Sequence, residues 1–512
     1  MADTRSDNLF DVFASRFPAD VTKPFLLLPD GGAVSYGDMI EQSGRIAALL
    51  QAHAVKPGGR VAAQVEKSAA ALMLYLGCLR AGAAYLPLNT AYTGEELDYF
   101  LQDAAPTVVV CDPVREADTL ARAQKAGVAH VFTVGADSSG TLTAAAANCD
   151  PMSGAFKAAA DDLAAILYSS GTTGKPKGAM MSHGALAANA AALHKVWRFG
   201  PDDVLLHALP VFHTHGLFVA TNTVLMNGTA MMFQPRFDAG AVIAALPTAT
   251  VFMGVPTYYT RLLAQAGFTA DACANIRLFI SGSAPLLDET FTAFTQRTGH
   301  SIVERYGMTE SGIITSADLE KPRRAGTVGW PLDGVEVRIA DDDDVPLSAG
   351  QTGGVQIKSA GLFTGYWNKP DKTAAEFTTD GFFRTGDIGL VDDSGQLTLI
   401  GRAKDMYISG GFNVFPKEIE QAIDAMDGLI ESAVVGLPHP DFGEAGLAII
   451  VADSDAIDGE TIRTALKGAL ANYKVPKLVT ITDSLPRNAM GKVQKNVLRD
   501  TYRALWDTFL KS

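Results

Sequence analysis

Short apolar runs alternate with longer amphipathic segments over the first 112 residues. Residues 59–65 (GRVAAQV) follow a Pro-Gly turn and predict a strand, and residues 68–82 (SAAALMLYLGCLRAG) have helical spacing. The pattern repeats as a strand at 83–89, a helix at 95–104 and a strand at 106–112. Strands that alternate with helices of this length predict an α/β domain with a parallel sheet.

The rest of the chain divides into segments that differ in their pattern of hydrophobic and polar residues. Residues 134–160 are rich in small residues with little periodicity, which predicts a surface connection, and a second α/β unit follows up to about residue 307. After Trp330 the segments 335–359 and 390–407 have the pattern of hairpin strands, with Asp341 to Asp344 as a solvated turn. The last hundred residues return to a mixed α/β pattern. No internal repeat is evident.

These patterns predict the domain organisation and fold class. A chain of 512 residues is long for a single core. We place the major boundary at the stretch GRAKD, which gives a large part at 1–403 and a small lid at 404–512. The predicted fold is α/β: a large amino-terminal domain of stacked α/β sheets plus a β-rich subdomain, with a small α+β carboxyl-terminal lid.

Charge and composition exclude several classes of function. The chain has 42 basic and 56 acidic residues, a net charge of −14, which argues against a nucleic-acid or anionic-membrane partner. The four cysteines show no paired spacing, so a disulfide or zinc framework is not expected. The amino terminus lacks a secretory signal pattern, and no apolar run is long enough to span a membrane. A cytoplasmic protein is therefore expected, in which local positive groups must hold any anionic ligand.

The segment 168–178 (YSSGTTGKPKG) has the composition of a phosphate-binding loop. Glycines let consecutive N–H groups converge on an anion, and the segment follows a strand that is predicted to be buried. It is not a Walker A loop, because Pro176 stands where that motif has a hydroxyl residue after Gly174-Lys175. Kinase or GTPase chemistry is thus disfavoured. A flexible surface loop is the alternative from this stretch alone.

Four further stretches carry chemistry-bearing residues in a fixed order. They are YGMTES at 306–311, FFRTGD at 382–387, GRAKDMYISGGFNVFPKEIE at 401–420 and PRNAMGKVQK at 486–495. Singly each is ordinary, since Asp387 could cap a turn and Lys492 could be a solvated surface charge. Together with the glycine-rich loop, they identify the chain as similar to the adenylate-forming acyl-CoA synthetases over residues 20–500. Within that superfamily, which also includes luciferases and peptide-synthetase adenylation domains, the likeness is greatest to malonyl-CoA synthetases.

The resemblance implies a reaction in two halves. A carboxylate attacks the α-phosphorus of ATP to give an acyl-adenylate and pyrophosphate, and the CoA thiol then displaces AMP. ATP, Mg²⁺ and coenzyme A are the implied cofactor and cosubstrates, and the lid is implied to be mobile. Most of the catalytic work is the positioning of two anions that repel each other.

The same resemblance assigns the nucleotide site. Ser170 to Gly178 would wrap the β- and γ-phosphates, Thr309 would contact the α-phosphate, and Glu310 would hold Mg²⁺. For Glu310 an ordinary helix N-terminal carboxylate is the alternative. The implied ATP-binding residues are Ser169, Ser170, Gly171, Thr172, Thr173, Gly174, Lys175, Lys177, Ser281, Gly282, Ser283, Ala284, Pro285, Tyr306, Gly307, Asp387 and Arg402.

Particular roles follow for some of these residues. Tyr306 would stack on adenine, with Ser281 to Pro285 as the opposite wall, and Asp387 would accept hydrogen bonds from the ribose, helped by Arg402. Phe383 stands where relatives often have Tyr, which removes one hydroxyl near this position.

Three lid positions are also implied by the resemblance. Lys492 would lie between the carboxylate and the α-phosphate as a compact ammonium. Lys404 would be the hinge about which the lid rotates, and Gly410 and Gly411 would let the CoA arm pass. A plain linker glycine pair is the alternative for the last two.

Three residues bear on the acid. His213 should reach the acyl pocket, with a satisfied core histidine as the alternative, and Met308 would limit pocket depth. By resemblance to malonyl-CoA synthetases, Arg236 is assigned to the distal carboxylate of a dicarboxylic acid, because a buried second charge needs a partner. A surface salt bridge is the alternative for Arg236. The predicted product is malonyl-CoA, with methylmalonyl-CoA as a second product.

Other functions share most of these motifs. A short-chain, medium-chain or aryl acyl-CoA synthetase would differ only in the acid pocket. A peptide-synthetase module would need a carrier domain, and the sequence stops at Ser512. A non-catalytic nucleotide-binding protein would be expected to lack Lys492 or Glu310, and both are present. The sequence does not predict an oligomeric state.

Overall fold

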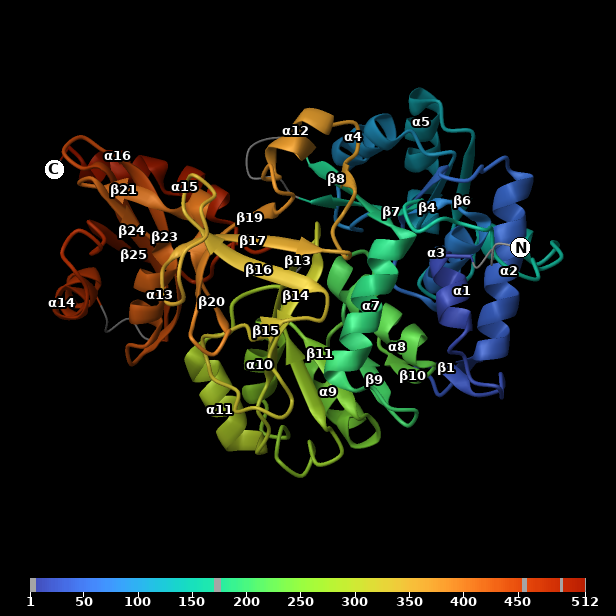
Figure 1. Ribbon diagram of the computed structural model, residues 1–512, viewed down its shortest axis with the longest axis horizontal. Helices are drawn as coiled ribbons and strands as arrows, with labels where there is room; N and C mark the ends of the chain where they lie inside the picture. Colours follow the sequence, from blue (N-terminus) through green and yellow to red (C-terminus); the bar gives the residue numbers. More distant parts are fainter. Residues whose placement is uncertain (1–5, 170–175, 454–457, 489–490, 512) are drawn as a thin grey trace.

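A large amino-terminal part and a smaller carboxyl-terminal part make up the molecule (Figure 1). The computed structural model describes residues 6–169, 176–453, 458–488 and 491–511. The described strands form sheets of nine, seven, four and five strands, and the five-stranded sheet belongs to the carboxyl-terminal part alone. Within these residues no helix has both the length and the apolar character needed to cross a membrane.

The seven-stranded sheet confirms the parallel α/β pattern predicted for the start of the chain. Its order is β18-β8-β7-β4-β3-β5-β6, and β3 to β7 pair in parallel while β8 and β18 are antiparallel. The strands are β3 (Arg60–Gln64), β4 (Ala84–Pro87), β5 (Val108–Cys111), β6 (His130–Thr133), β7 (Leu163–Ser169), β8 (Lys177–Ser182) and β18 (Gly365–Tyr366). The helices beside them are α2 (Tyr36–Ala52), α3 (Ala69–Ala81), α4 (Gly94–Ala104), η1 (Pro113–Arg115) and α5 (Glu116–Ala126).

One segment differs from its prediction. The region 134–160 was expected to be an irregular connection, but it contains the helix α6 (Thr141–Ala146). Its pattern is too short to show a helical period, and the helix is held by burial of Leu142 and by packing against α2. The prediction is therefore wrong for these residues, because tertiary packing and not local propensity forms the helix.

The nine-stranded sheet brings distant parts of the chain together. Its order is β15-β14-β13-β12-β11-β9-β10-β1-β2, and β1 pairs in parallel with β10 although some 200 residues separate them. Its strands are β1 (Pro24–Leu27), β2 (Ala33–Ser35), β9 (Val204–His207), β10 (Ala230–Phe233), β11 (Val251–Gly254), β12 (Leu278–Ser281), β13 (Val303–Met308), β14 (Gly312–Ser316) and β15 (Trp330–Pro331). Its helices are α9 (Ala239–Ala245), η3 (Leu246–Thr248), α10 (Pro256–Leu263) and α11 (Asp288–Thr298).

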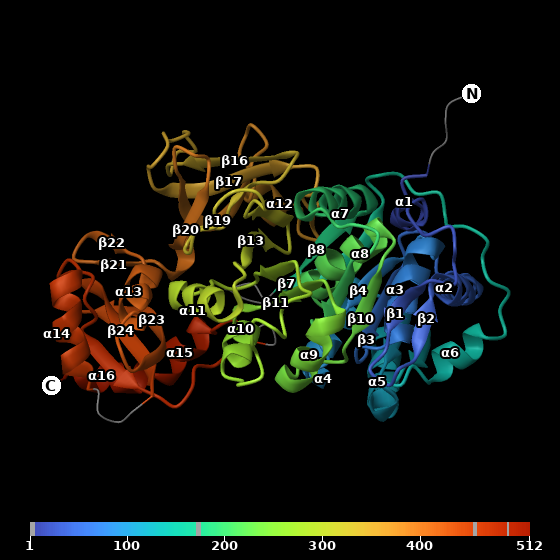
Figure 2. The same cartoon turned by 90° about the horizontal axis from the view of Figure 1, so that it is seen from below.

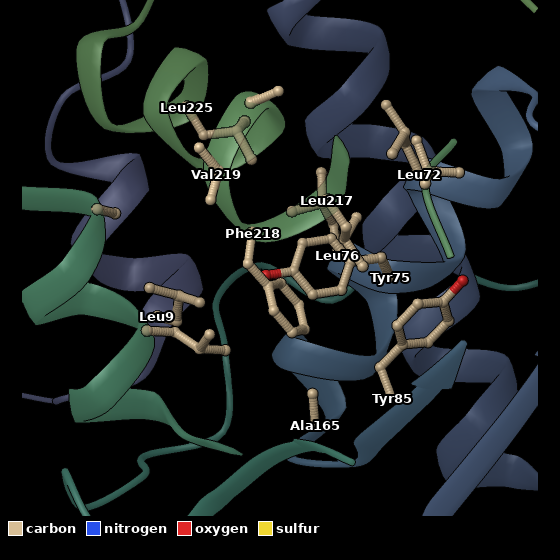
Figure 3. Close-up of a cluster of buried hydrophobic side chains, with 14 of the residues drawn as sticks. Leu9, Leu72, Tyr75, Leu76, Tyr85, Ala165, Leu217, Phe218, Val219 and Leu225 are labelled. Carbon is tan, nitrogen blue, oxygen red and sulfur yellow. The ribbon is translucent and has the colours of Figure 1, made fainter. Parts of the chain in front are cut away.

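Helices between these two sheets form the main core. They are α1 (Leu9–Ala14), α7 (His183–Trp197), the π-helical turn η2 (His215–Thr221) and α8 (Asn222–Asn227), packed with α3. Figure 3 shows Leu217 and Phe218 of η2 beside Tyr75 and Leu76 of α3, and the rings of Tyr75 and Phe218 lie 6.0 Å apart. A π-helical turn inside a packed core is uncommon and is often found at functional sites.

The hairpin pattern predicted after Trp330 is confirmed. The strands β16 (Val335–Ala340), β17 (Gly353–Ser359), β19 (Phe383–Val391) and β20 (Leu397–Arg402) form an antiparallel sheet, with α12 (Pro370–Ala375) nearby in sequence. Asp341 accepts hydrogen bonds from the backbone N–H groups of Asp343 and Val345, so this acidic run forms the expected turn.

The carboxyl-terminal part has its own sheet and core. The strands are β21 (Tyr407–Ser409), β22 (Phe412–Val414), β23 (Leu429–His439), β24 (Gly443–Ala452) and β25 (Leu478–Ile481). The helices are α13 (Pro416–Asp424), α14 (Gly459–Ala469), α15 (Lys495–Thr501) and α16 (Arg503–Phe509). The boundary placed at 403/404 falls within the short helix η4 (Ala403–Asp405), which joins this part to β20. Figure 2 shows the carboxyl-terminal part beside α10 and α11 of the large part.

Candidate active site

Loops at the carboxyl ends of parallel strands form the site. The strands β9, β11, β12 and β13 pair in parallel, so the segments that follow them lie along one edge of the sheet. These strand ends and the segments after them contain Ser281 to Pro285, Tyr306 to Met308 and His213 from the residues assigned from the sequence to ATP and to the acid. The lid adds Lys492 from the turn before α15.

A buried carboxylate lies on the side assigned to the nucleotide. Asp387 stands opposite Arg402 in the register of β19 and β20, and its Oδ1 lies 3.0 Å from Arg402 Nε. The hydroxyl of Tyr306 donates to Asp387 Oδ2 over 2.5 Å. The structure thus brings together these three predicted residues, with Asp387 paired with Arg402 and accepting a hydrogen bond from Tyr306.

Lys492 reaches this group from the lid. Its backbone N–H donates to Asn488 Oδ1 and its carbonyl accepts from the N–H of Asn488, which fixes a tight turn around Gly491. Burial and the nearby Arg402 together lower the pKa of Lys492 to about 8, while Asp387 opposes the shift. Burial, with the charges of Arg305 and Lys492, likewise lowers the pKa of His213 to about 4. Lys492 therefore lies within electrostatic reach of both Asp387 and His213.

Glu310 is held in the turn between β13 and β14, not at a helix terminus. It is 6 % exposed, and its Oε1 accepts hydrogen bonds from Ser169 Oγ at 3.2 Å and from the Tyr366 hydroxyl at 3.1 Å. Both of these donors reach Oε1, so among the described residues Oε2 is the oxygen left for a cation. A single carboxylate oxygen fits Mg²⁺, which keeps several waters and binds phosphates as further ligands.

The glycine-rich loop is only partly described. Ser170, Gly171, Thr172, Thr173, Gly174 and Lys175 lie outside the described residues. Lys177 is paired with Glu376, with Nζ 3.2 Å from Oε1, and it lies over the ring of Tyr366. Pro176 is also held, because its carbonyl accepts from the Tyr99 hydroxyl at 2.7 Å. The end of the loop is thus anchored to α4 and to β18.

Cationic and neutral nitrogen groups dominate the side assigned to the acid. Arg305 on β13 is 6 % exposed, and its Nε and Nη2 have no hydrogen-bond partner among the described residues. Burial lowers its pKa to about 9. Ser283 Oγ lies 3.2 Å from His215 Nδ1, while His215 Nε2 has no hydrogen-bond partner in the same part of the chain. Burial and the charge of Arg305 hold the pKa of His215 far below its ordinary value.

Two glycines make this packing possible. A Cβ on Gly282 would lie 2.5 Å from the guanidinium carbon of Arg305, and a Cβ on Gly307 would lie 2.2 Å from the carbonyl oxygen of Gly312. Ser283 itself has a φ of +73°, a strained value for a residue with a side chain. The SGSAP segment therefore follows the guanidinium closely. Ala284 and Pro285 continue it toward α11.

Some predicted residues lie outside this cluster. Arg236 is exposed between β10 and α9, and Met308 is half-buried at the end of β13. Gly410 and Gly411 form the exposed turn between β21 and β22, with φ values of +61° and +86°. Lys404 lies in η4, where burial and Arg402 lower its pKa.

Two residues of the site, Arg305 and Tyr366, were not predicted from the sequence. Arg305 could have been found, because Glu304 and Arg305 interrupt an otherwise apolar strand directly before YGMTES. Tyr366 carried no local signal. A cleft between the large part and the lid, beside Lys492, is lined by Thr257, Tyr258 and Arg261 from one side and by Arg487 and Gly491 from the other. Arg261 is therefore a further cation near the site.

This geometry suits the activation of a carboxylate with a nucleotide. An ion-paired carboxylate, a half-buried lysine and a carboxylate that could hold a metal lie at one edge of the sheet, and the guanidinium of Arg305, unpaired at Nε and Nη2 among the described residues, is part of the same site. The residues matching the description "AMP-binding enzyme" are 10–367, and residues 418–492 match "AMP-binding enzyme C-terminal domain". The chain therefore belongs to the AMP-binding enzyme family, and it is an acid–thiol ligase of the AMP-forming acyl-CoA synthetase class.

Two solved structures of one relative can be compared with this chain over nearly its whole length. The chain is 49 % identical to ATP-bound MatB from Rhodopseudomonas palustris, with a TM-score of 0.96 over 98 % of this chain and 100 % of that one. The same protein solved without ATP gives a TM-score of 0.84 at the same coverage, so the arrangement here is more similar to the ATP-bound form.

Curated relatives include enzymes for different acids. A malonate–CoA ligase from Arabidopsis thaliana is 33 % identical, covering 97 % of this chain and 89 % of its own. A feruloyl-CoA synthase from Amycolatopsis sp is also 33 % identical, covering 92 % and 94 %. Similarity at this level establishes the class of enzyme and leaves the acid to be argued from the site.

Proposed function

We propose that this enzyme forms malonyl-CoA from malonate, ATP and CoA, with methylmalonate as a second acid. The reaction passes through an acyl-adenylate and releases AMP and pyrophosphate. The observation that carries the choice of acid is the buried Arg305 guanidinium, whose Nε and Nη2 have no hydrogen-bond partner among the described residues. Support comes from the likeness to MatB, a malonyl-CoA synthetase, and to the malonate–CoA ligase.

The chemistry of a dicarboxylic acid matches this arginine. One carboxylate of malonate reacts, while the other must leave water and needs a charged partner. Nε and Nη2 form one edge of the guanidinium, which can pair with both oxygens of a carboxylate. An uncharged acyl tail would leave the buried cation unpaired, so the pocket favours a second negative charge.

The remaining roles follow from the positions of the residues. Lys492, within electrostatic reach of Asp387 and His213, would stabilise charge at the attacking carboxylate and the α-phosphate, beside Thr309. Mg²⁺ on Glu310 would neutralise phosphate charge. Asp387 and Arg402 would hold the ribose, with Tyr306 against the base. Rotation about Lys404 would then bring Gly410 and Gly411 to the CoA arm.

Arg236 remains the candidate from sequence for the distal carboxylate. It is exposed, so a carboxylate paired with it would stay largely hydrated and would gain little. The structure offers Arg305 as the buried alternative and Arg261 as a second cation in the adjoining cleft. Substitution of each of these three arginines is expected to change kcat/KM for malonate by a different amount.

Pyrophosphate release over a panel of acids tests the proposal. The purified enzyme is given ATP, Mg²⁺ and malonate, methylmalonate, acetate, octanoate or coumarate, with and without CoA. We expect malonate to give the highest kcat/KM, followed by methylmalonate, with thioester formed only when CoA is present. A preference for octanoate or coumarate would replace malonate by a medium-chain or aryl acid, and equal rates with acetate would exclude a role for the second carboxylate.

A further inference from the structure

A buried lysine connects the two large sheets next to the acid pocket. Lys67 follows β3 of the seven-stranded sheet and is 8 % exposed. Its Nζ lies 2.8 Å from the carbonyl oxygen of His207 and 2.9 Å from His207 Nδ1, at the end of β9 in the nine-stranded sheet. The ammonium also lies 4.3 Å from the ring centre of Phe233. Among the described residues no carboxylate forms an ion pair with Lys67.

The contact with Gly216 fixes the tautomer of His207. A carbonyl oxygen can only accept, so the ring proton of the fully buried His207 is on Nε2, and Nδ1 accepts from Lys67, whose own pKa burial holds well below its ordinary value. Nε2 lies 2.8 Å from the carbonyl oxygen of Gly216 and donates to it. The Thr221 hydroxyl donates to the same oxygen over 2.9 Å. Burial and the charge of Lys67 lower the pKa of His207 well below its ordinary value, which supports a neutral ring.

Gly216 is the point at which the acid-pocket loop joins the core. A Cβ on Gly216 would lie 1.9 Å from the carbonyl oxygen of Pro210, so the loop between these residues is tightly closed. His213 and His215 are the loop residues whose pKa values respond to Arg305. After Gly216 the π-helical turn η2 packs against α3 through Phe218 (Figure 3). A shift of the Gly216 carbonyl would therefore move both histidines relative to the guanidinium.

We propose that Lys67 is a positioning residue for the acid pocket, acting through His207 on Gly216 to set where His213 and His215 face the acid. It does not touch the substrate. The inference rests on the proposed location of the acid pocket beside Arg305, and it holds for whichever acid that pocket accepts. A contact that only links the two sheets would have the same geometry. The test must therefore distinguish a structural role of Lys67 from the positioning of the acid pocket.

Matched substitutions at His207 provide that separation. His207→Gln places an amide N–H near the position of Nε2 and keeps a donor for Gly216, whereas His207→Asn is too short to reach it. Lys67→Met removes the ammonium and keeps the length of the side chain. The acid used is the best substrate from the panel, so failure of malonate as the substrate does not affect this experiment. KM for the acid, KM for ATP, kcat and thermal unfolding are measured for each variant.

We expect Lys67→Met and His207→Asn to raise KM for the acid by about tenfold, with KM for ATP within about twofold of the parent. His207→Gln should stay close to the parent. Arg277→Met is the control, since it breaks the pair with Asp203 at the opposite end of the same strands and should lower thermal stability without changing KM for the acid.

Two results would overturn the proposal. One is a loss of thermal stability in all of these variants with no change in the ratio of the two KM values. The other is equal behaviour of His207→Gln and His207→Asn, which would show that the donor to Gly216 has no effect. If Lys67→Met does not fold, the two His207 variants still decide the question, because both leave the ammonium in place.

Discussion

The nucleotide side and the acid side of the site differ in whether their buried charged groups already have partners. On the nucleotide side Asp387 is already paired with Arg402 and Tyr306, and Glu310 already accepts from Ser169 and Tyr366. On the acid side the guanidinium edge of Arg305 has no partner among the described residues, and neither has His215 Nε2. Among the described residues, the two carboxylates of the nucleotide side already have partners, whereas Nε and Nη2 of the guanidinium on the acid side have none.

The difference follows from what each side would hold. A ribose is neutral, so a carboxylate that binds its hydroxyls must be kept charged and oriented by the protein itself. A dicarboxylic acid provides its own second charge, and a protein carboxylate beside Arg305 would compete with it. In a chain with a net charge of −14, Arg305 forms no ion pair with a carboxylate among the described residues.

Lys492 belongs to both sides, and its loss should have the largest effect. Lys492→Ala removes the ammonium that faces both anions, and such a loss costs about 3–4 kcal/mol of barrier. We therefore expect adenylation, measured as pyrophosphate release, to fall by about 10²- to 10³-fold. Thioester formation from supplied acyl-adenylate and CoA should be much less affected. An equal loss in both half-reactions would contradict the assignment of Lys492 to the first step.

Substitution of Arg305 tests the acid side directly. Arg305→Met should lower kcat/KM for malonate by about 100-fold, corresponding to about 3 kcal/mol for an unpaired buried charge, and should leave acetate almost unchanged. Thermal unfolding should occur at the same or a higher temperature, because no buried protein carboxylate loses its partner. A lower unfolding temperature with equal losses for both acids would show that Arg305 is structural.

Arg236→Ala and Arg261→Ala complete this comparison. Arg236 is exposed, so its loss should cost about 1 kcal/mol or less for malonate. If Arg236→Ala instead gives the largest loss specific to malonate, the distal carboxylate binds at the surface and the role predicted from the sequence is correct. Arg261→Ala should fall between the two, since Arg261 lines the cleft next to Lys492.

Substitution of Asp387 tests the nucleotide side. Asp387→Asn weakens the hydrogen bond from Tyr306, worth about 1.5–3 kcal/mol, and removes the ion pair with Arg402, so it should raise KM for ATP by roughly ten- to thirtyfold. KM for the acid should change little. The same measurement on Asp380→Asn, which alters an exposed ion pair with Arg338, serves as the control. A matching rise in KM for the acid would show that the two sides are not separate.

The pH dependence of adenylation tests the charge of Lys492 without removing its side chain. Because the pKa of Lys492 is lowered to about 8, its ammonium is lost at a lower pH than for an ordinary lysine. Above pH 8, kcat/KM for pyrophosphate release should fall, by about tenfold at pH 9. Lys492→Arg should remove this decline, since a guanidinium stays charged. A decline that persists in Lys492→Arg must come from another group.

Hydrophobic patterning predicted much of the fold but not its assembly. The strands and helices from β3 to β5, and the hairpins after Trp330, follow local periods of two and 3.6 residues. The pairing of β1 with β10 and the helix α6 were not predictable in this way. Both depend on partners distant in sequence, and no local pattern encodes such a partner.

The loop at 168–178 shows how far motifs alone can reach. Its proline after Lys175 excluded the Walker A reading, and the ordered set of motifs identified the class of enzyme, which the family match confirms. Motifs of this kind are readable because backbone geometry and phosphate chemistry restrict both residue types and spacing.

The sequence by itself determined the class of enzyme and the alternating α/β pattern, and it supplied the candidate groups for the nucleotide. Only the tertiary structure decided which arginine is buried beside His213, and that Lys67 meets His207. The charge of an arginine is visible in the sequence, but its energetic value depends on burial and on unpaired hydrogen-bond donors. These are properties of packing between β13, the SGSAP segment and η2, so they exist only once distant segments have come together.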